Sequence, residues 1–218
     1  VLFYSDGLNV YDASHQIMVR GDGLNADVNG IQAISASPAT GPGNENRYYL
    51  FTRDSNGEIF YTLIDMTAQG SRADGPPVGE VVLGERNQAT GITGRSDGMI
   101  TIGSRDMTRF WLITQNANTR AFEVYSINGG GVFNLETTMA LTAEVTSMHF
   151  SYNNRTSRLA IIPSNNVNIQ VAVFNEAQQM LTFETAVTSS FVLNETFGGS
   201  AGWSIDGTKL YFSRNAAA

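Results

Sequence analysis

The sequence predicts an all-β protein, a β-propeller of four-stranded antiparallel blades. Strand-like runs fill the chain, turn dipeptides separate them, and a similar unit recurs at a spacing of roughly 53 to 57 residues. The chain has 218 residues, of which 42% are hydrophobic and 15% are charged. It can therefore bury a sizeable core, and it lacks the composition of a disordered protein.

Short runs rich in β-branched and aromatic residues predict the strands. The best helical pattern, at 175–179, is so short that we interpret it as a hairpin connection. Such strand-like runs occur all along the chain; examples, in chain order, are 47–52, 58–64, 99–102, 110–114, 121–127, 158–162 and 209–213. Because Asp, Asn and Gly tolerate the backbone angles of tight turns, turns are predicted at Asp6-Gly7, Asn56-Gly57, Asp97-Gly98 and Asp206-Gly207.

The repeated unit predicts how the chain is divided. Residues 149–162 and 202–213 share an aromatic residue followed by Ser, an Asp or Asn turn, and a basic residue followed by Leu. Segments that begin at Ile34 and Ile92 hold the same place upstream. Each unit has room for four strands, which is the size of a propeller blade. We expect about four to five blades of a larger ring, at 1–30 (partial), 31–85, 86–143, 144–193 and 194–218 (partial).

Charge and cysteine content exclude several classes of function. Thirteen basic against twenty acidic residues give a net charge of −7, and Lys209 is the one lysine. Without a basic stripe we expect neither nucleic-acid binding nor docking on anionic lipid. The chain has no cysteine, which excludes disulfides, thiolate metal sites and a cysteine nucleophile. No run approaches the ~18 apolar residues of a membrane helix, so we expect no direct membrane insertion.

Several segments resemble one family, in order along the chain. Residues 2–12 and 15–18 (LFYSDGLNVYD, HQIM) are similar to the opening of large Bacteroidetes surface proteins. These are gliding-motility-associated or type IX secretion-sorted proteins, and the resemblance is to their N-terminal WD40-like β-propeller region. The other matching segments are 48–52 (YYLFT), 60–66 (FYTLIDM), 110–114 (FWLIT) and 203–213 (WSIDGTKLYFS).

The resemblance implies a ring of about seven blades in a long secreted protein. It implies an extracellular or cell-surface location, strands before Val1, blades after Ala218 and further domains of the same polypeptide. It implies no enzymatic activity. The predicted function is a non-catalytic binding or adhesion module that presents propeller loops to a glycan or protein partner. The alternatives are a glycosidase-like propeller enzyme and a structural subunit of a surface filament or secretion assembly.

Two motifs could carry chemistry. Residues 94–98 (GRSDG) match the G-x-S-x-G nucleophile elbow, for which only His15 and His149 could supply a base. Because a strand follows, we interpret 94–98 as an ordinary β-turn. Residues 25–30 (NADVNG) resemble the start of a calcium loop but lack the terminal Glu of an EF-hand. The candidate ligands for a structural calcium ion are Asp22, Asp27 and Asn29, and no other cofactor is expected.

Carboxylates and aromatic residues are the side chains that could form a glycan site. A glycosidase needs paired acids, and the candidates Asp6, Asp54, Asp97 and Asp206 all stand at predicted turns. Aromatic residues in strands are expected to belong mostly to the core; these are Tyr48, Tyr61, Trp111, Tyr125, Trp203 and Tyr211. The polar loops 39–46 and 70–77 are better candidates for a recognition rim.

Overall fold

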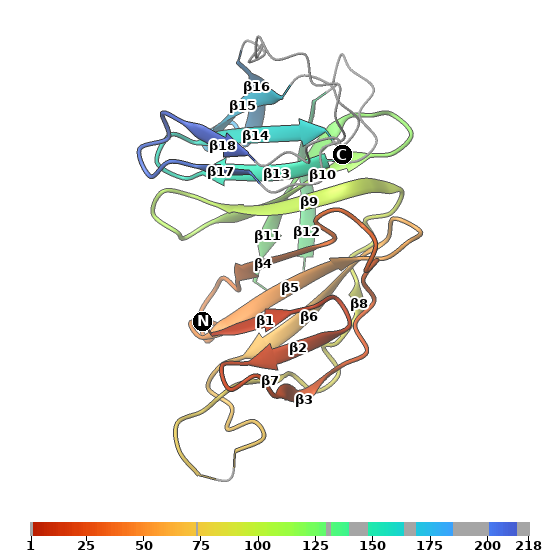
Figure 1. Cartoon of the computed structure of the whole chain (residues 1–218), viewed down its shortest axis with the longest axis vertical. Coiled ribbons are helices and arrows are strands. Elements are labelled where there is room, and N and C mark those ends of the chain that lie inside the picture. The colour runs from red at the N-terminus through yellow and green to blue at the C-terminus, as the bar shows by residue number, and fades with distance from the viewer. Residues whose placement is uncertain are drawn as a thin grey trace, which may run out of the picture. The chain divides into compact units, whose positions relative to one another are not determined.

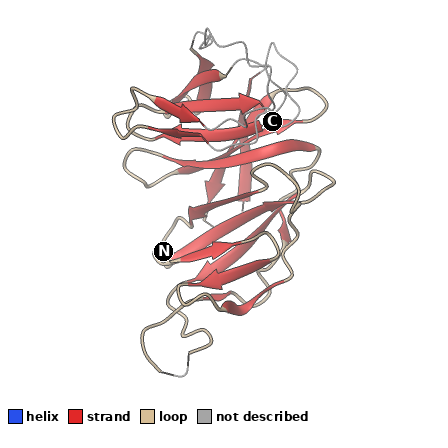
Figure 2. Cartoon of the chain, in the orientation of Figure 1, coloured by secondary structure: helices blue, strands red, loops and turns tan. Residues whose placement is uncertain are grey.

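The protein is all-β, as the sequence predicts. A computed structural model describes residues 2–72, 74–129, 132–139, 148–163, 169–184 and 201–212. Within these ranges every regular element is a β-strand (Figures 1 and 2). The chain forms two compact units, Val1–Arg95 with Ile127–Phe133, and Ser96–Ser126 with Asn134–Ala218. No helix in the described residues is long and apolar enough to cross a membrane.

The first unit is built on one eight-stranded sheet. Its strand order is β1-β2-β3-β7-β6-β5-β4, and β8 pairs with β6. Neighbouring strands are antiparallel except β3 and β7, which pair in parallel through Val19 and Glu80. Its strands are β1 (Phe3–Ser5), β2 (Asn9–Asp12), β3 (Ile17–Asp22), β4 (Ile34–Pro38), β5 (Arg47–Arg53), β6 (Ile59–Asp65), β7 (Glu80–Val81) and β8 (Gln88–Ala89). One core cluster holds Val10, Met18, Leu24, Leu50, Ile64 and Val81.

The second unit contains most of two four-stranded sheets and a hairpin. In both four-stranded sheets each strand pairs with its neighbour in sequence, in the orders β12-β11-β10-β9 and β13-β14-β15-β16. The hairpin is β17-β18. The strands are β9 (Arg95–Gly103), β10 (Phe110–Asn116), β11 (Phe122–Asn128), β12 (Val132–Met139), β13 (Met148–Asn153), β14 (Arg158–Pro163), β15 (Gln170–Asn175), β16 (Met180–Phe183), β17 (Ala201–Trp203) and β18 (Leu210–Phe212).

The sheet β13–β16 buries apolar side chains on both faces. Successive side chains of a strand point to opposite faces of its sheet. On β14, Leu159 and Ile161 join a core cluster that contains Trp111 and Phe122 of the sheet β9–β12. The intervening Ala160 and Ile162 belong to a second cluster, against which Trp203 and Leu210 of the hairpin β17–β18 pack. The apolar run 159–162 is therefore continuous because sheets cover both of its sides.

Three of the four predicted turns are confirmed. Asp6-Gly7, Asn56-Gly57 and Asp206-Gly207 connect β1 to β2, β5 to β6 and β17 to β18. The prediction for Asp97-Gly98 is wrong, because both residues lie inside β9. Gly98 is required there for space, since a Cβ atom would lie 2.3 Å from the carbonyl oxygen of Met148. The segment 175–179 connects β15 to β16, as predicted.

Candidate functional site

A hydrogen-bonded turn joins β9 to β10. The hydroxyl of Ser104 donates to Asp106 Oδ1 at 2.5 Å, and the same carboxylate oxygen accepts both the amide and the hydroxyl of Thr108. The amide of Arg109 donates to Ser104 Oγ at 3.0 Å. Met107 takes a positive φ of 58°. The Ser104 hydroxyl and then Thr108 lower the pKa of Asp106 to about 2, because both donate to its charged form.

The turn between β17 and β18 repeats this network 100 residues later. Ser204 Oγ donates to Asp206 Oδ1 at 2.5 Å, and the amide and hydroxyl of Thr208 donate to the same oxygen. The amide of Lys209 donates to Ser204 Oγ at 3.0 Å, and Gly207 has a positive φ of 68°. The pKa of Asp206 is likewise lowered to about 2, first by the Ser204 hydroxyl.

Two further turns use an asparagine side chain in place of the aspartate. Asn153 Oδ1, at the end of β13, accepts the amide and hydroxyl of Thr156. Asn175 Oδ1, at the end of β15, accepts the amides of Ala177 and Gln178. In such Asx turns the backbone amides donate to the asparagine side-chain oxygen, and these bonds hold the ends of β13 and β15 in one conformation.

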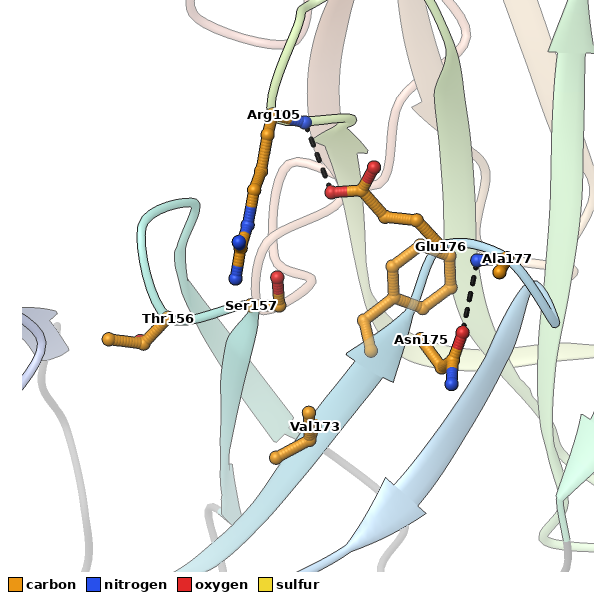
Figure 3. Close-up of a pocket in the computed structure, with 8 residues that line it drawn as sticks. Arg105, Thr156, Ser157, Val173, Asn175, Glu176 and Ala177 are labelled. Atoms are coloured by element: carbon orange, nitrogen blue, oxygen red, sulfur yellow. Dashed lines mark hydrogen bonds between the residues drawn. The ribbon is translucent and has the colours of Figure 1, made fainter.

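Three of these turns, those that follow β9, β13 and β15, border a hollow in the second unit (Figure 3). Its volume is about 400 Å³, which is the size of a small-molecule site. The wall comes from the turns after β9, β13 and β15, together with the last residues of β15. The lining residues are Arg105, Thr156, Ser157, Val173, Phe174, Asn175, Glu176 and Ala177. We call this feature the turn hollow.

Glu176 ties two of the turns together. Its Oε1 accepts the backbone amide of Arg105 at 3.0 Å, as the dashed line in Figure 3 shows, and its Oε2 lies 3.8 Å from Arg109 Nη2. The guanidinium of Arg109 also lies 5.3 Å from the ring centre of Trp111. The carboxylate of Glu176 is therefore already engaged by neighbouring donors. The Arg105 guanidinium, in contrast, has no hydrogen-bond or ion-pair partner among the described residues.

A second link joins the same two sheets through side chains. The indole Nε1 of Trp111 on β10 donates to Gln179 Oε1 at 2.7 Å. Gln179 then donates from Nε2 to Glu136 on β12, which also accepts the hydroxyl of Ser126. Because these bonds cross from β10–β12 to the β15–β16 turn, they fix one side of the turn hollow.

The carboxylates of Asp22 and Asp27, two of the three predicted calcium ligands, have partners within the protein, and the third residue, Asn29, donates its backbone amide to Asp27. Asp27 Oδ2 lies 3.3 Å from Nη1 of the buried Arg53, and its Oδ1 accepts the amide of Asn29. Asp22 lies at the end of β3, where its Oδ1 accepts Arg86 Nη1 at 3.1 Å. Within the described residues, no three or more His, Asp or Glu side chains gather closely enough to hold a metal ion. Calcium binding by Asp22, Asp27 and Asn29 stays a prediction.

The other candidate carboxylates divide into two groups. Asp6, Asp54 and Asp206 accept backbone amides inside their own turns, as predicted from turn chemistry. Burial opposes ionisation of Asp6, but the bonds from Asn9, Leu8 and Tyr11 outweigh it, so its pKa is lowered. Asp97 lies on β9 instead of in a turn.

The nucleophile-elbow reading of 94–98 finds no support. Ser96 lies on β9, buried, with its hydroxyl unpartnered, and β9 continues to Gly103 without a helix. The interpretation of 94–98 as a turn is also wrong for Arg95 to Gly98, because these residues begin β9. His149 lies on β13, where burial lowers its pKa. His15 lies in the turn between β2 and β3, with Nδ1 3.0 Å from the Tyr4 hydroxyl.

Some predicted aromatic residues do belong to the core. Trp111 and Tyr125 are buried, whereas Tyr211 on β18 is 61% exposed. The predicted loops 39–46 and 70–77 connect β4 to β5 and β6 to β7, and none of the residues that line the turn hollow comes from them. Sequence reasoning therefore missed Arg105, Asn175 and Glu176. Arg105 could have been noticed from the sequence, because the pattern Ser-x-Asp-x-Thr-(Arg/Lys) occurs at both 104–109 and 204–209.

The comparisons with known proteins leave the function open. No family model and no curated protein matches the chain. Among solved structures the chain is similar to a crystal structure of a protein from Lactobacillus plantarum, with 14% sequence identity and a TM-score of 0.48. The similarity covers 94% of this chain and 70% of that one. A likeness this distant carries no information on function.

Proposed function

We propose that this chain is a segment of a β-propeller that acts as a non-catalytic binding module, with the turn hollow as its ligand site. The partner is a glycan or a protein at a bacterial cell surface. The observation that carries the proposal is the turn hollow itself, where polar side chains from three fixed turns meet around about 400 Å³. The location rests on the resemblance of 2–18 to the Bacteroidetes surface proteins.

The propeller architecture is supported by how the sheets of the second unit pack. Propeller blades are four-stranded sheets, each formed by consecutive strands, that stack face to face around an axis. The sheet β13–β16 packs through one face against β9–β12 and through the other against β17–β18. The repeated network at Ser104–Arg109 and Ser204–Lys209 also places equivalent turns after the first strand of the sheet β9–β12 and after the first strand of the hairpin β17–β18.

Binding is favoured over catalysis by what the carboxylates already do. Glu176, the acid in the turn hollow, accepts the Arg105 amide and lies near Arg109. Asp106 and Asp206 have pKa values of about 2, so they are ionised at neutral pH and cannot act as general acids. A hollow bordered by hydrogen-bonded turns is suited to holding a ligand with little loss of conformational entropy.

The test is to block the turn hollow without touching the core. Ala177 is exposed and lines the hollow, so Ala177→Trp should fill it with an indole. Gln178→Trp places the same ring on the same turn at an exposed residue outside the lining. On an array of immobilised glycans and peptides, we expect Ala177→Trp to lose binding and Gln178→Trp to keep it. Equal binding by both variants would exclude the turn hollow as the site.

A further inference from the structure

The geometry points to a carboxylate-bearing sugar as the ligand of the turn hollow, with Arg105 as its anchor. This inference rests on the proposed function and specifies the ligand class for the same site. Among the charged groups that line the turn hollow, Glu176 is engaged by protein donors. Arg105 is exposed, and its guanidinium lacks a partner among the described residues. The positive charge of Arg105 is therefore the one that a ligand would neutralise, and such a ligand would be an anion.

A guanidinium is suited to this role by its shape. Its planar N–H groups match the two oxygens of a carboxylate and bind them through paired hydrogen bonds. The Arg105 backbone is held by the hydrogen bond that its amide donates to Glu176 Oε1, so its side chain starts from a fixed position. In Figure 3 that side chain extends toward the turn that carries Thr156 and Ser157. A bound carboxylate at its end would lie beside these hydroxyl groups.

The rest of the turn hollow provides contacts for a sugar ring. Asn175 uses its Oδ1 for the turn, and its Nδ2 donor has no partner within the described residues. Ser157 contributes a hydroxyl group, and Thr156 contributes a hydroxyl oxygen as an acceptor, because its proton is donated to Asn153 Oδ1. The half-buried Val173 contributes an aliphatic surface. Hydroxyl-rich rings with one apolar face need this mixture of side-chain donors and aliphatic carbon.

An acidic peptide is the competing ligand, and the shape of the site disfavours it. Extended peptides are usually held by main-chain bonds to a sheet edge or in a long groove. The turn hollow is instead bordered by turns, and the carbonyl of Ser157 is not free for a peptide because it already accepts the amide of Phe174. A single sugar unit at the end of a glycan matches its size better than a strand does.

The experiment is an NMR titration of the purified chain with D-glucuronate and with D-glucose, followed through backbone amide shifts. We expect glucuronate to move the amides around Arg105 and Asn175 and to bind at least about tenfold more tightly than glucose. Arg105→Gln should remove that preference, and Arg105→Lys should keep part of it. Arg155→Gln is the matched control, because Arg155 is exposed in the 153–158 turn but does not line the turn hollow.

Four outcomes would overturn the inference, and the first three leave the proposed function standing. If glucuronate and glucose bind equally and Ala177→Trp abolishes both, the site is real but does not select acids. If Arg155→Gln weakens glucuronate binding as much as Arg105→Gln, the effect is one of general charge. If a glutamate-rich peptide binds through Arg105 while glucuronate does not, the ligand is a protein. If Ala177→Trp leaves the binding of every ligand unchanged, the turn hollow is not the binding site, and the proposed function is overturned as well.

Discussion

At the scale of single residues, the carboxylates of Asp106 and Asp206 form the same turn twice. Each accepts three donors on one oxygen: a preceding serine hydroxyl and the amide and hydroxyl of a following threonine. Donors of this kind stabilise the ionised form, which is why both pKa values lie near 2.

The first prediction concerns acid stability. A carboxylate with a lowered pKa in the folded state stabilises the fold fully above its unfolded pKa of 3.8, and that contribution is lost as the pH falls through about 2. We expect the free energy of unfolding to decline across this window. In Asp106→Asn with Asp206→Asn, which keep an acceptor but cannot titrate, the decline should be smaller. Urea denaturation at pH 2 to 5 measures it, and an unchanged pH profile would contradict the assignment.

The second prediction concerns Gly207, which occupies the place that Met107 has in the other turn. An added Cβ at Gly207 would lie 2.5 Å from Thr156 Cγ2, and its φ of 68° disfavours side chains. Gly207→Ala should therefore destabilise the protein by about 2 kcal/mol in chemical denaturation. Gly202→Ala is the control, because nothing lies within 4 Å of its added Cβ; it should change stability by less than about 0.5 kcal/mol. Equal effects would show that contact with Thr156 is unimportant.

At the scale of elements, β9 is the strand that local sequence describes least well. Asp97-Gly98 has the composition of a turn, yet β9 runs from Arg95 to Gly103. The positive φ of Gly98 and its approach to Met148 explain the glycine through packing. The turn that sequence reasoning placed at Asp97-Gly98 lies instead at 104–109, where Ser104 and Asp106 supply the bonds.

The third prediction tests this reading of β9. Gly98→Ala would bring its Cβ to 2.3 Å from the Met148 carbonyl, and we expect a loss of about 3 kcal/mol on top of backbone strain. Gly94→Ala has a similar positive φ of 67° but no atom within 4 Å, so it should cost only about 1 kcal/mol. The difference between the two midpoints of thermal unfolding isolates the packing effect. If the two variants are equally stable, the approach of β9 to Met148 is not tight.

At the scale of the whole molecule, the excess of acidic residues coexists with many arginine ion pairs. The side chains of Arg86 and Asp22 are 42% and 71% exposed, whereas those of Arg53 and Asp27 are 8% and 19% exposed. Exposed pairs contribute little, but removing one partner of a buried pair leaves an uncompensated charge. Other pairs within the units are Arg20–Glu80, Arg47–Asp65, Arg109–Glu176 and Arg158–Glu184.

The fourth prediction separates this ion-pair role from calcium binding. Asp27→Ala should destabilise the protein by about 3 kcal/mol, because the buried Arg53 loses the carboxylate that offsets its charge. Asp22→Ala should cost less than about 1 kcal/mol. If the two aspartates hold calcium, as the sequence pattern at 22–30 predicts, added calcium should raise the Tm of the unsubstituted chain and of neither variant. A Tm that does not respond to calcium or to chelator would contradict the calcium prediction.

Much of the fold could be predicted from local patterns, but little of the site. The strands 47–52, 110–114 and 121–127 fall within β5, β10 and β11, and the hairpin at 175–179 is where its composition indicates. The turn hollow was missed because its residues come from three turns that are about 20 to 70 positions apart in the sequence. Arg105 and Glu176 become neighbours only when the sheets β9–β12 and β13–β16 pack together.

By itself, the sequence determined the all-β class, the positions of the strands given above as examples, and three of the four predicted turns. These depend on alternation and on turn chemistry, which act over a few neighbouring residues. Only the tertiary structure decided that Gly98 serves packing, that Asp27 pairs with Arg53, and that Arg105 stands beside a hollow. The reason is physical: each of these depends on which distant strand or turn lies opposite, and a periodic pattern of apolar and polar residues specifies only which face of a strand is buried.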